Sequence, residues 1–170
     1  MKIRILSALI ILFVFLELSA QTKTAEVSFS YLKQRGFASN QFAVWVEDSN
    51  GAYVKTLYAT AFTAKGGWTY RELSLPEWVK KAGLASKPKI DGVTGATPAA
   101  GKLTYVWDFS GVKTGDYFVC LEATLRSEKR VLYRAKINTA KASSVRPEPI
   151  YFGDNSEERA MISNVVITVK

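Results

Sequence analysis

Apolar and polar residues alternate along most of the chain, with the period of two that is typical of β-strands that bury one face. In the first such segment, residues 25–33, the pattern places Val27, Phe29 and Tyr31 on one face. The other segments that predict strands are 41–46, 52–62, 103–109, 117–124, 130–139 and 162–169. Short strands at this spacing, joined by turns, indicate an all-β fold, an immunoglobulin-like antiparallel β-sandwich of about seven to eight strands.

Turn residues support two of the expected connections between strands. Ser49, Asn50 and Gly51 separate two apolar segments, and Asn-Gly in this position predicts a tight hairpin whose strands pair antiparallel. The polar residues 126–129 predict a second hairpin turn further along the chain.

The middle of the chain is less regular. One short helix is expected near residues 75–83 (LPEWVKKAG), because a proline lies near its start and a glycine at its end. Residues 68–70 predict a short strand. Residues 85–101 and 141–160 carry no clear alternation, so both segments are expected to be loops.

The N-terminus has the order of a secretory signal peptide. Lys2 and Arg4 precede an apolar run over residues 5–16, and small residues end at Ala20. A membrane anchor would need roughly 20 apolar residues, and this run is shorter. We expect residues 1–20 to be a signal peptide and residues 21–170 to be one β-sandwich domain, exported to the periplasm or the outside of the cell.

Composition excludes several classes of function. The chain has no histidine, which removes His-dependent catalytic triads, His-ligated haem and most zinc sites. Its one cysteine, Cys120, cannot form an intramolecular disulfide, and is expected to be a buried strand residue rather than a free redox thiol. The net charge of +8 is scattered along the chain, and export argues against a nucleic-acid partner. No nucleophile–base pair is apparent, so the chain is not expected to be an enzyme.

Two weaker groups of candidates have ordinary alternatives. The neighbouring carboxylates Glu47 and Asp48 could bind calcium, or could belong to the adjacent turn. Aromatic residues that could line a ligand groove, or else fill the core or cover a sheet face, are Trp45, Trp68, Tyr70, Trp78 and Tyr105.

The order of several longer segments is similar to that of a known family. The segments are QFAVWVEDSNGAYVKTL, DGVTGATPAAG, YVWDFSG and TGDYFVCLEA. Over about residues 42–137 the chain resembles the exported bacterial proteins of domain-of-unknown-function family 2271. The resemblance implies an immunoglobulin-type sandwich in the periplasm. It also implies extracytoplasmic or membrane redox proteins as partners, since genes of this family tend to lie near flavin-transfer genes.

Residues 91–97, DGVTGAT, resemble a second pattern, Asp-x-x-Ser/Thr-Gly-Ala-Thr. This is the attachment motif of carrier subunits that hold FMN on a threonine through a phosphoester bond, placed there by a FAD:protein FMN transferase. The resemblance implies Thr97 as the acceptor, with Asp91 organising the loop and Thr94, Gly95 and Ala96 completing the motif. The same residue types also favour an ordinary turn-rich loop.

The sequence therefore favours a non-enzymatic exported binding or accessory protein, associated with a membrane-linked flavin redox system and requiring no cofactor. The alternative is an electron carrier with FMN covalently attached to Thr97.

Overall fold

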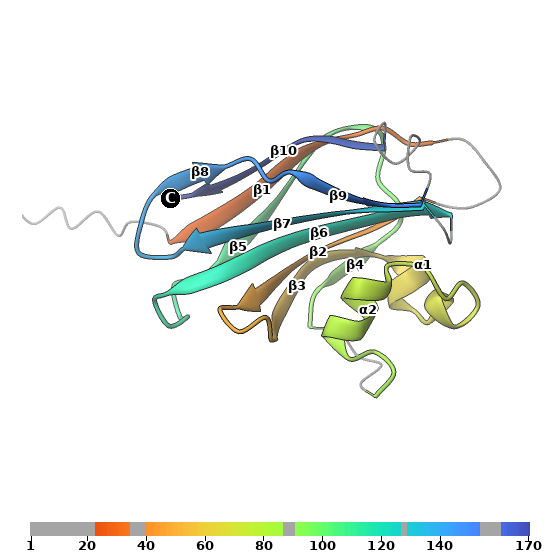
Figure 1. Cartoon of the computed structure of the whole chain (residues 1–170), viewed down its shortest axis with the longest axis horizontal. Coiled ribbons are helices and arrows are strands. Elements are labelled where there is room, and N and C mark those ends of the chain that lie inside the picture. The colour runs from red at the N-terminus through yellow and green to blue at the C-terminus, as the bar shows by residue number, and fades with distance from the viewer. Residues whose placement is uncertain (1–22, 35–39, 87–90, 127–128, 154–160) are drawn as a thin grey trace, which may run out of the picture.

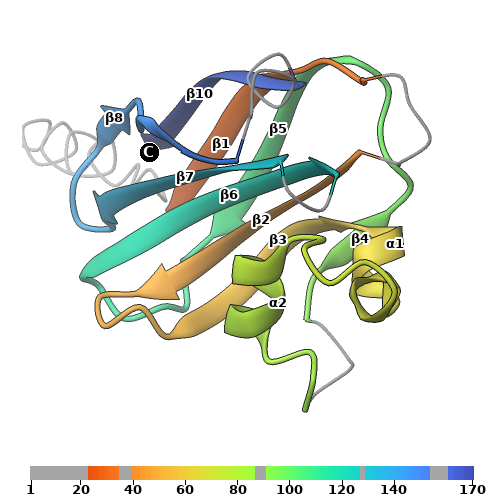
Figure 2. The same cartoon turned by 45° about the vertical axis from the view of Figure 1, so that its right-hand side comes forward.

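The protein is a sandwich of two β-sheets that pack face to face (Figures 1 and 2). This computed structural model describes residues 23–34, 40–86, 91–126, 129–153 and 161–170. The fold confirms the expected all-β sandwich. The expected signal peptide, residues 1–20, lies outside the described residues. Within the described ranges, no helix is long and apolar enough to cross a membrane.

The smaller sheet has four strands in the order β5-β1-β10-β8. They are β1 (Thr24–Tyr31), β5 (Gly101–Asp108), β8 (Ser143–Val145) and β10 (Ile162–Val169). The larger sheet has six strands in the order β4-β3-β2-β6-β7-β9. They are β2 (Gln41–Asp48), β3 (Tyr53–Thr60), β4 (Val93–Gly95), β6 (Asp116–Arg126), β7 (Lys129–Asn138) and β9 (Pro149–Phe152). The predicted hairpin β2–β3 is present, and β6 and β7 also pair antiparallel.

The number of strands was underestimated, because β4, β8 and β9 lie in the segments expected to be loops. Each has only three or four residues, which is too short for alternation to be recognised. In addition, β4 pairs with β3 in parallel, so the sandwich is not purely antiparallel.

The expected helix is confirmed as α2 (Pro76–Ala82). The expected strand at residues 68–70 is wrong, because Gly67–Thr69 forms a short 3₁₀ helix, η2. The residue before η2, Gly66, has a φ of 95°. This left-handed conformation turns the chain, and glycine adopts it readily. A one-turn helix α1 (Ala61–Ala64) was not expected, because it directly follows β3 with no break in the apolar pattern.

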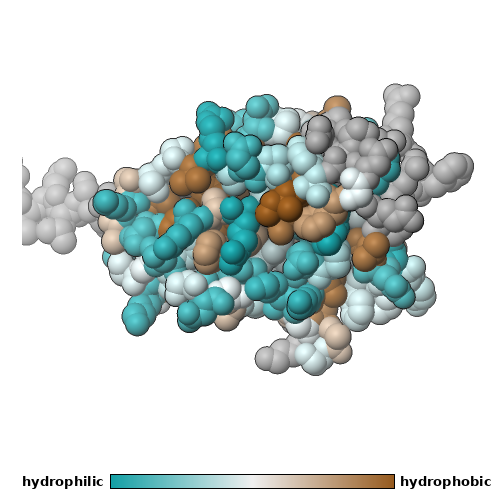
Figure 3. Space-filling model, in the orientation of Figure 1, coloured by the Kyte–Doolittle hydropathy of each residue, from teal (hydrophilic) through white to brown (hydrophobic). Residues whose placement is uncertain are grey.

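Two hydrophobic clusters hold these elements together. The larger lies between the sheets and contains Val27, Phe29 and Tyr31, as the alternation predicts. The smaller lies on the outer face of the six-stranded sheet, where α2 covers it, and includes Trp45 and Trp78. Strand β2 is therefore buried on both faces, whereas an uncovered sandwich strand would expose one. On the surface face in Figure 3, hydrophobic side chains form small patches among hydrophilic ones.

Candidate functional site

The 91–97 loop lies along the free edge of β3. Its central residues form β4, in which Val93 pairs with Tyr58 and Gly95 with Thr60. Val93 is 65% exposed, and Thr94 is also exposed. The loop is therefore part of the surface of the sandwich, at the edge of the six-stranded sheet.

The start of the loop is anchored by a chain of hydrogen bonds that leads into the helix-covered cluster. Tyr53 donates to Asp91 Oδ1 at 2.5 Å, and the Trp78 indole donates to Thr56 Oγ1 at 3.0 Å. The hydroxyls of Tyr53 and Thr56 lie 2.7 Å apart. Since Tyr53 donates its proton to Asp91, Thr56 donates to Tyr53. Asp91 therefore has a structural partner in the fold.

Glycine is required at position 92 by a close backbone approach. A Cβ on Gly92 would lie 2.4 Å from the carbonyl oxygen of Thr56. No side chain fits there unless the loop moves away from β3.

The end of the loop is anchored by Tyr58 and Asn40. Tyr58 donates a 2.7 Å hydrogen bond to the carbonyl of Ala96. A Cβ on Gly95 would lie 3.2 Å from the Tyr58 hydroxyl, so a larger residue would crowd this bond. Thr97 Oγ1 donates to the carbonyl of Asn40 at 3.1 Å. All of the predicted site residues thus lie together in one docked loop.

The surroundings of Thr97 are compatible with a group esterified to its oxygen. Thr97 is half-buried and its hydroxyl uses its proton in the bond to Asn40; among the described residues, none donates a hydrogen bond to the oxygen itself. If that proton were lost, the Asn40 carbonyl would keep the 2.9 Å hydrogen bond from Gln41 Nε2. The side-chain Oδ1 of Asn40 is also buried and has no partner in the described part of the chain, and like the carbonyl it can only accept hydrogen bonds.

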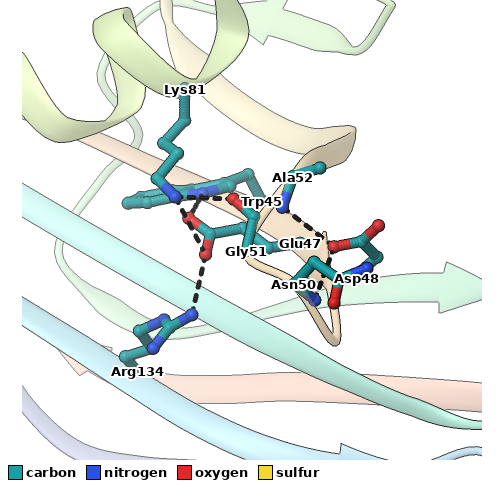
Figure 4. Close-up of polar contacts among 8 residues, drawn as sticks. All are labelled: Trp45, Glu47, Asp48, Asn50, Gly51, Ala52, Lys81 and Arg134. Carbon is teal, nitrogen blue, oxygen red and sulfur yellow. Dashed lines mark hydrogen bonds and ion pairs between the residues drawn. The ribbon is translucent and has the colours of Figure 1, made fainter.

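A second polar cluster, centred on Glu47, was not expected from the sequence (Figure 4). The Glu47 side chain is 2% exposed and accepts 3.0 Å hydrogen bonds from the Trp45 indole and from Arg134. The Lys81 ammonium of α2 lies 3.5 Å from the same carboxylate. A hollow of about 300 Å³ opens above this cluster. The only available signal was a glutamate that follows Trp45 on the outward face of a largely apolar strand.

Glu47 and Asp48 do not form the calcium site that was considered for them, because their carboxylates have separate partners. Cations and an indole surround Glu47, while Asp48 Oδ1 accepts from the backbone N–H groups of Asn50 and Ala52 at 2.8 and 2.9 Å. Asp48 therefore stabilises the hairpin turn. Within the described ranges, no group of three or more Cys, Asp or Glu side chains is arranged to hold a metal ion.

The thiol of Cys120 also lines the hollow above Glu47. The side chain is 1% exposed, and burial raises the pKa of this thiol, to which the nearby Glu47 carboxylate adds. The thiol therefore stays protonated at neutral pH and is a poor nucleophile. The expectation of a buried strand residue is confirmed.

The aromatic candidates do not share a groove. Trp45 and Trp78 are buried in the helix-covered cluster, and Trp68 packs against it. Tyr70 is 91% exposed, and Tyr105 is half-buried on the other sheet. Tyr105 reaches the side of the 91–97 loop through its stacking on Tyr58, and Trp78 reaches it through Thr56.

Comparison with known proteins identifies the family. Searches of curated proteins and of solved structures find no match. A family model described as "Predicted periplasmic protein (DUF2271)" matches residues 22–148, a longer segment than the expected 42–137. The chain belongs to this family, whose description supports the expected export to the periplasm.

Proposed function

We propose that this DUF2271 member is a non-enzymatic accessory module of the periplasm that serves a membrane-linked flavin redox system through its 91–97 loop. Residues 1–20 are removed as a signal peptide after Ala20. The observation that carries the proposal is the loop itself. Its two ends are fixed by Tyr53 and Tyr58, while Val93 and Thr94 between them face solvent.

The chemistry of the remaining polar clusters supports a role without catalysis. The chain has no histidine, and the buried Glu47 is already bound by Arg134 and Lys81. Cys120 is a protonated thiol. An exposed segment on a rigid scaffold is the usual arrangement for recognition by a partner.

Photo-crosslinking from Val93 tests the accessory role. A photoreactive amino acid replaces Val93 in one variant and Lys136, an exposed residue of β7, in the control. We expect adducts from position 93 with a membrane protein that carries flavin, haem or an iron–sulfur cluster, identified by mass spectrometry. Equal labelling from both positions, or adducts only with proteins that carry no redox group, would reject the role.

The second candidate is an electron carrier with FMN on Thr97, which the motif match at residues 91–97 and the surface position of the loop support. In this reaction Thr97 Oγ1 forms a bond to the FMN phosphorus of FAD, the pyrophosphate bond breaks, and AMP leaves. The hydroxyl proton passes to the transferase. Asn40 keeps its bond from Gln41 throughout. Bound FMN supplies one- and two-electron redox chemistry, and the protein supplies orientation.

Thr114 provides a control for the covalent-flavin candidate, because it is an exposed threonine outside the 91–97 motif. After co-expression with a FAD:protein FMN transferase, we expect an intact mass increase of one FMN and in-gel flavin fluorescence. Thr97→Ala abolishes both signals and Thr114→Ala keeps them. Signals that persist in Thr97→Ala would show that another residue is the acceptor. An unmodified wild-type chain, under conditions that flavinylate a known carrier, would reject the candidate.

A further inference from the structure

Strand β5 is the long open edge of the smaller sheet. It has eight residues and pairs with β1 from Gly101 to Asp108 without a bulge. Among the residues that the structure describes, no strand pairs with its other side. The remaining edge strands, β4, β8 and β9, have only three or four residues each, and β9 begins with Pro149. Strand β5 therefore has the length and regularity that an added strand needs, whereas the other edges are short.

The backbone of β5 presents a row of hydrogen-bonding groups at this open side. The N–H of Phe109, directly after the strand, donates to the carbonyl of Lys23 at 3.0 Å. Because backbone groups alternate in direction along an antiparallel pair, the N–H and C=O groups of Lys102, Thr104 and Val106 point away from β1. All three residues are exposed, and no described residue bonds to these backbone groups.

The side chains of β5 also lack neighbours at this edge. Leu103 and Tyr105 pack against the core but remain only half-buried, so an added strand with apolar residues at alternate positions would cover them. On the outer face, Lys102 and Asp108 lie near opposite ends of the strand, and neither forms an ion pair with a described residue. In an antiparallel strand, an acidic residue at one end and a basic residue at the other would face them.

The larger sheet leaves room beside β5 for one strand rather than for a second folded copy. Tyr105 of β5 stacks on Tyr58 of β3 with ring centroids 4.7 Å apart, so these strands lie opposite each other across the sandwich. The larger sheet continues one strand further, to β4, whereas the smaller sheet ends at β5. A single added strand would lie opposite β4. A second copy, paired through β5 about a two-fold axis, would bring its own β3 into the space that β4 occupies.

We propose that the open edge of β5 binds an extended segment of a partner protein by strand addition. The segment runs antiparallel to β5, has apolar residues at alternate positions, and carries an acidic residue opposite Lys102 and a basic residue opposite Asp108. Backbone hydrogen bonds supply the affinity, and the charges and the half-buried apolar side chains select the segment. This inference goes beyond the proposed role of the 91–97 loop and needs no cofactor.

A peptide with the sequence of β5 itself, GKLTYVWD, is a suitable probe. Aligned antiparallel with its tyrosine opposite Tyr105, it places its aspartate opposite Lys102 and its lysine opposite Asp108. The control peptide GDLTYVWK has the same composition but places like charges opposite each other. We expect saturable binding of the first peptide by fluorescence anisotropy, and severalfold weaker binding of the control. The first peptide should also slow amide hydrogen exchange in residues 101–108.

Val106→Pro tests the backbone contribution, because it removes an N–H that faces solvent rather than one that bonds to β1. Val106→Thr keeps this N–H and is the matched control. We expect Val106→Pro to lose peptide binding and Val106→Thr to keep it, with Cys120 protected from thiol reagents in both as evidence of folding. Should Val106→Pro not fold, the two peptides and the exchange measurement still decide.

Three results would overturn the strand-addition site: no peptide binding to the wild-type protein, equal binding of the two peptides, or unchanged binding in folded Val106→Pro. Light scattering separates a further alternative. A wild-type dimer that Val106→Pro dissociates would assign this edge to a second copy of the chain and overturn the partner segment.

Discussion

Glu122 of β6 accepts a 3.0 Å hydrogen bond from the backbone N–H of Trp78, in the first turn of α2. The residue before that helix, Leu75, provides no side-chain cap. The Glu122 carboxyl group from the sheet instead accepts hydrogen bonds from backbone N–H groups of the first turn, which have no partner within the helix. Glu122 also accepts from the N–H of Glu77 and pairs with Arg130 at 3.2 Å. The position of α2 is therefore set by a strand that follows it in the sequence.

Stability should depend on pH through Glu122. Burial raises the pKa of this carboxyl from 4.5 to about 7, although the hydrogen bonds from Trp78 and Arg130 act to lower it. The folded protein thus binds a proton that the unfolded chain has lost. The free energy of unfolding should fall as pH rises between these values, by up to about 1.4 kcal/mol per pH unit. Glu122→Gln should remove this slope in urea unfolding measured from pH 5 to pH 8. An identical slope in both proteins would contradict the assignment.

Removing the Glu47 carboxylate should destabilise the protein. Glu47→Ala leaves Arg134, Lys81 and the Trp45 indole without their acceptor, and breaking a buried pair costs about 2–3 kcal/mol where the cations can reach water. Glu47→Gln keeps an acceptor for the indole and should cost less. Lys136→Ala, which breaks an exposed pair with Asp116, should change little. Chemical denaturation measures all three, and equal effects of Glu47→Ala and Lys136→Ala would refute the prediction.

The close approach at Gly92 gives a third test. Gly92→Ala places a methyl group against the Thr56 carbonyl and should cost about 1–3 kcal/mol of unfolding free energy. Gly111→Ala is the control, because a Cβ there meets nothing within 4 Å, and it should be neutral or slightly stabilising. If the two alanine variants unfold at the same denaturant concentration, the loop does not dock on β3 as described.

Cys120 should resist thiol reagents in the folded protein. The side chain is buried and its pKa is raised, so labelling at pH 8 should occur only when the molecule unfolds. A Tyr70→Cys variant, at a position that is 91% exposed, should react at once at its new thiol. Rapid labelling of the wild-type protein without denaturant would disprove the buried position.

Sequence reasoning succeeded where structure is local. Alternation identified the long strands and the inward side of β1, and Asn50-Gly51 predicted the β2–β3 hairpin. It failed where tertiary contacts decide. Strand β4 forms because Gly92 and Gly95 allow the loop to approach β3 closely. Predicting it would require knowing that Thr56 and Tyr58 of β3 lie against these glycines. The Glu47 site joins residues from β2, α2 and β7, so adjacency in the sequence gave no indication of it.

The parallel pairing of β4 with β3 also limits association between copies of the chain, because it covers part of the edge of the larger sheet. An open edge strand offers unpaired backbone groups that can recruit another chain into a growing sheet. Here β4 covers Tyr58, Ala59 and Thr60 on one side of the larger sheet, and on the other side β9 begins with Pro149, which lacks an N–H. Loss of loop docking would therefore uncover these backbone groups of β3 and favour association between copies of the chain.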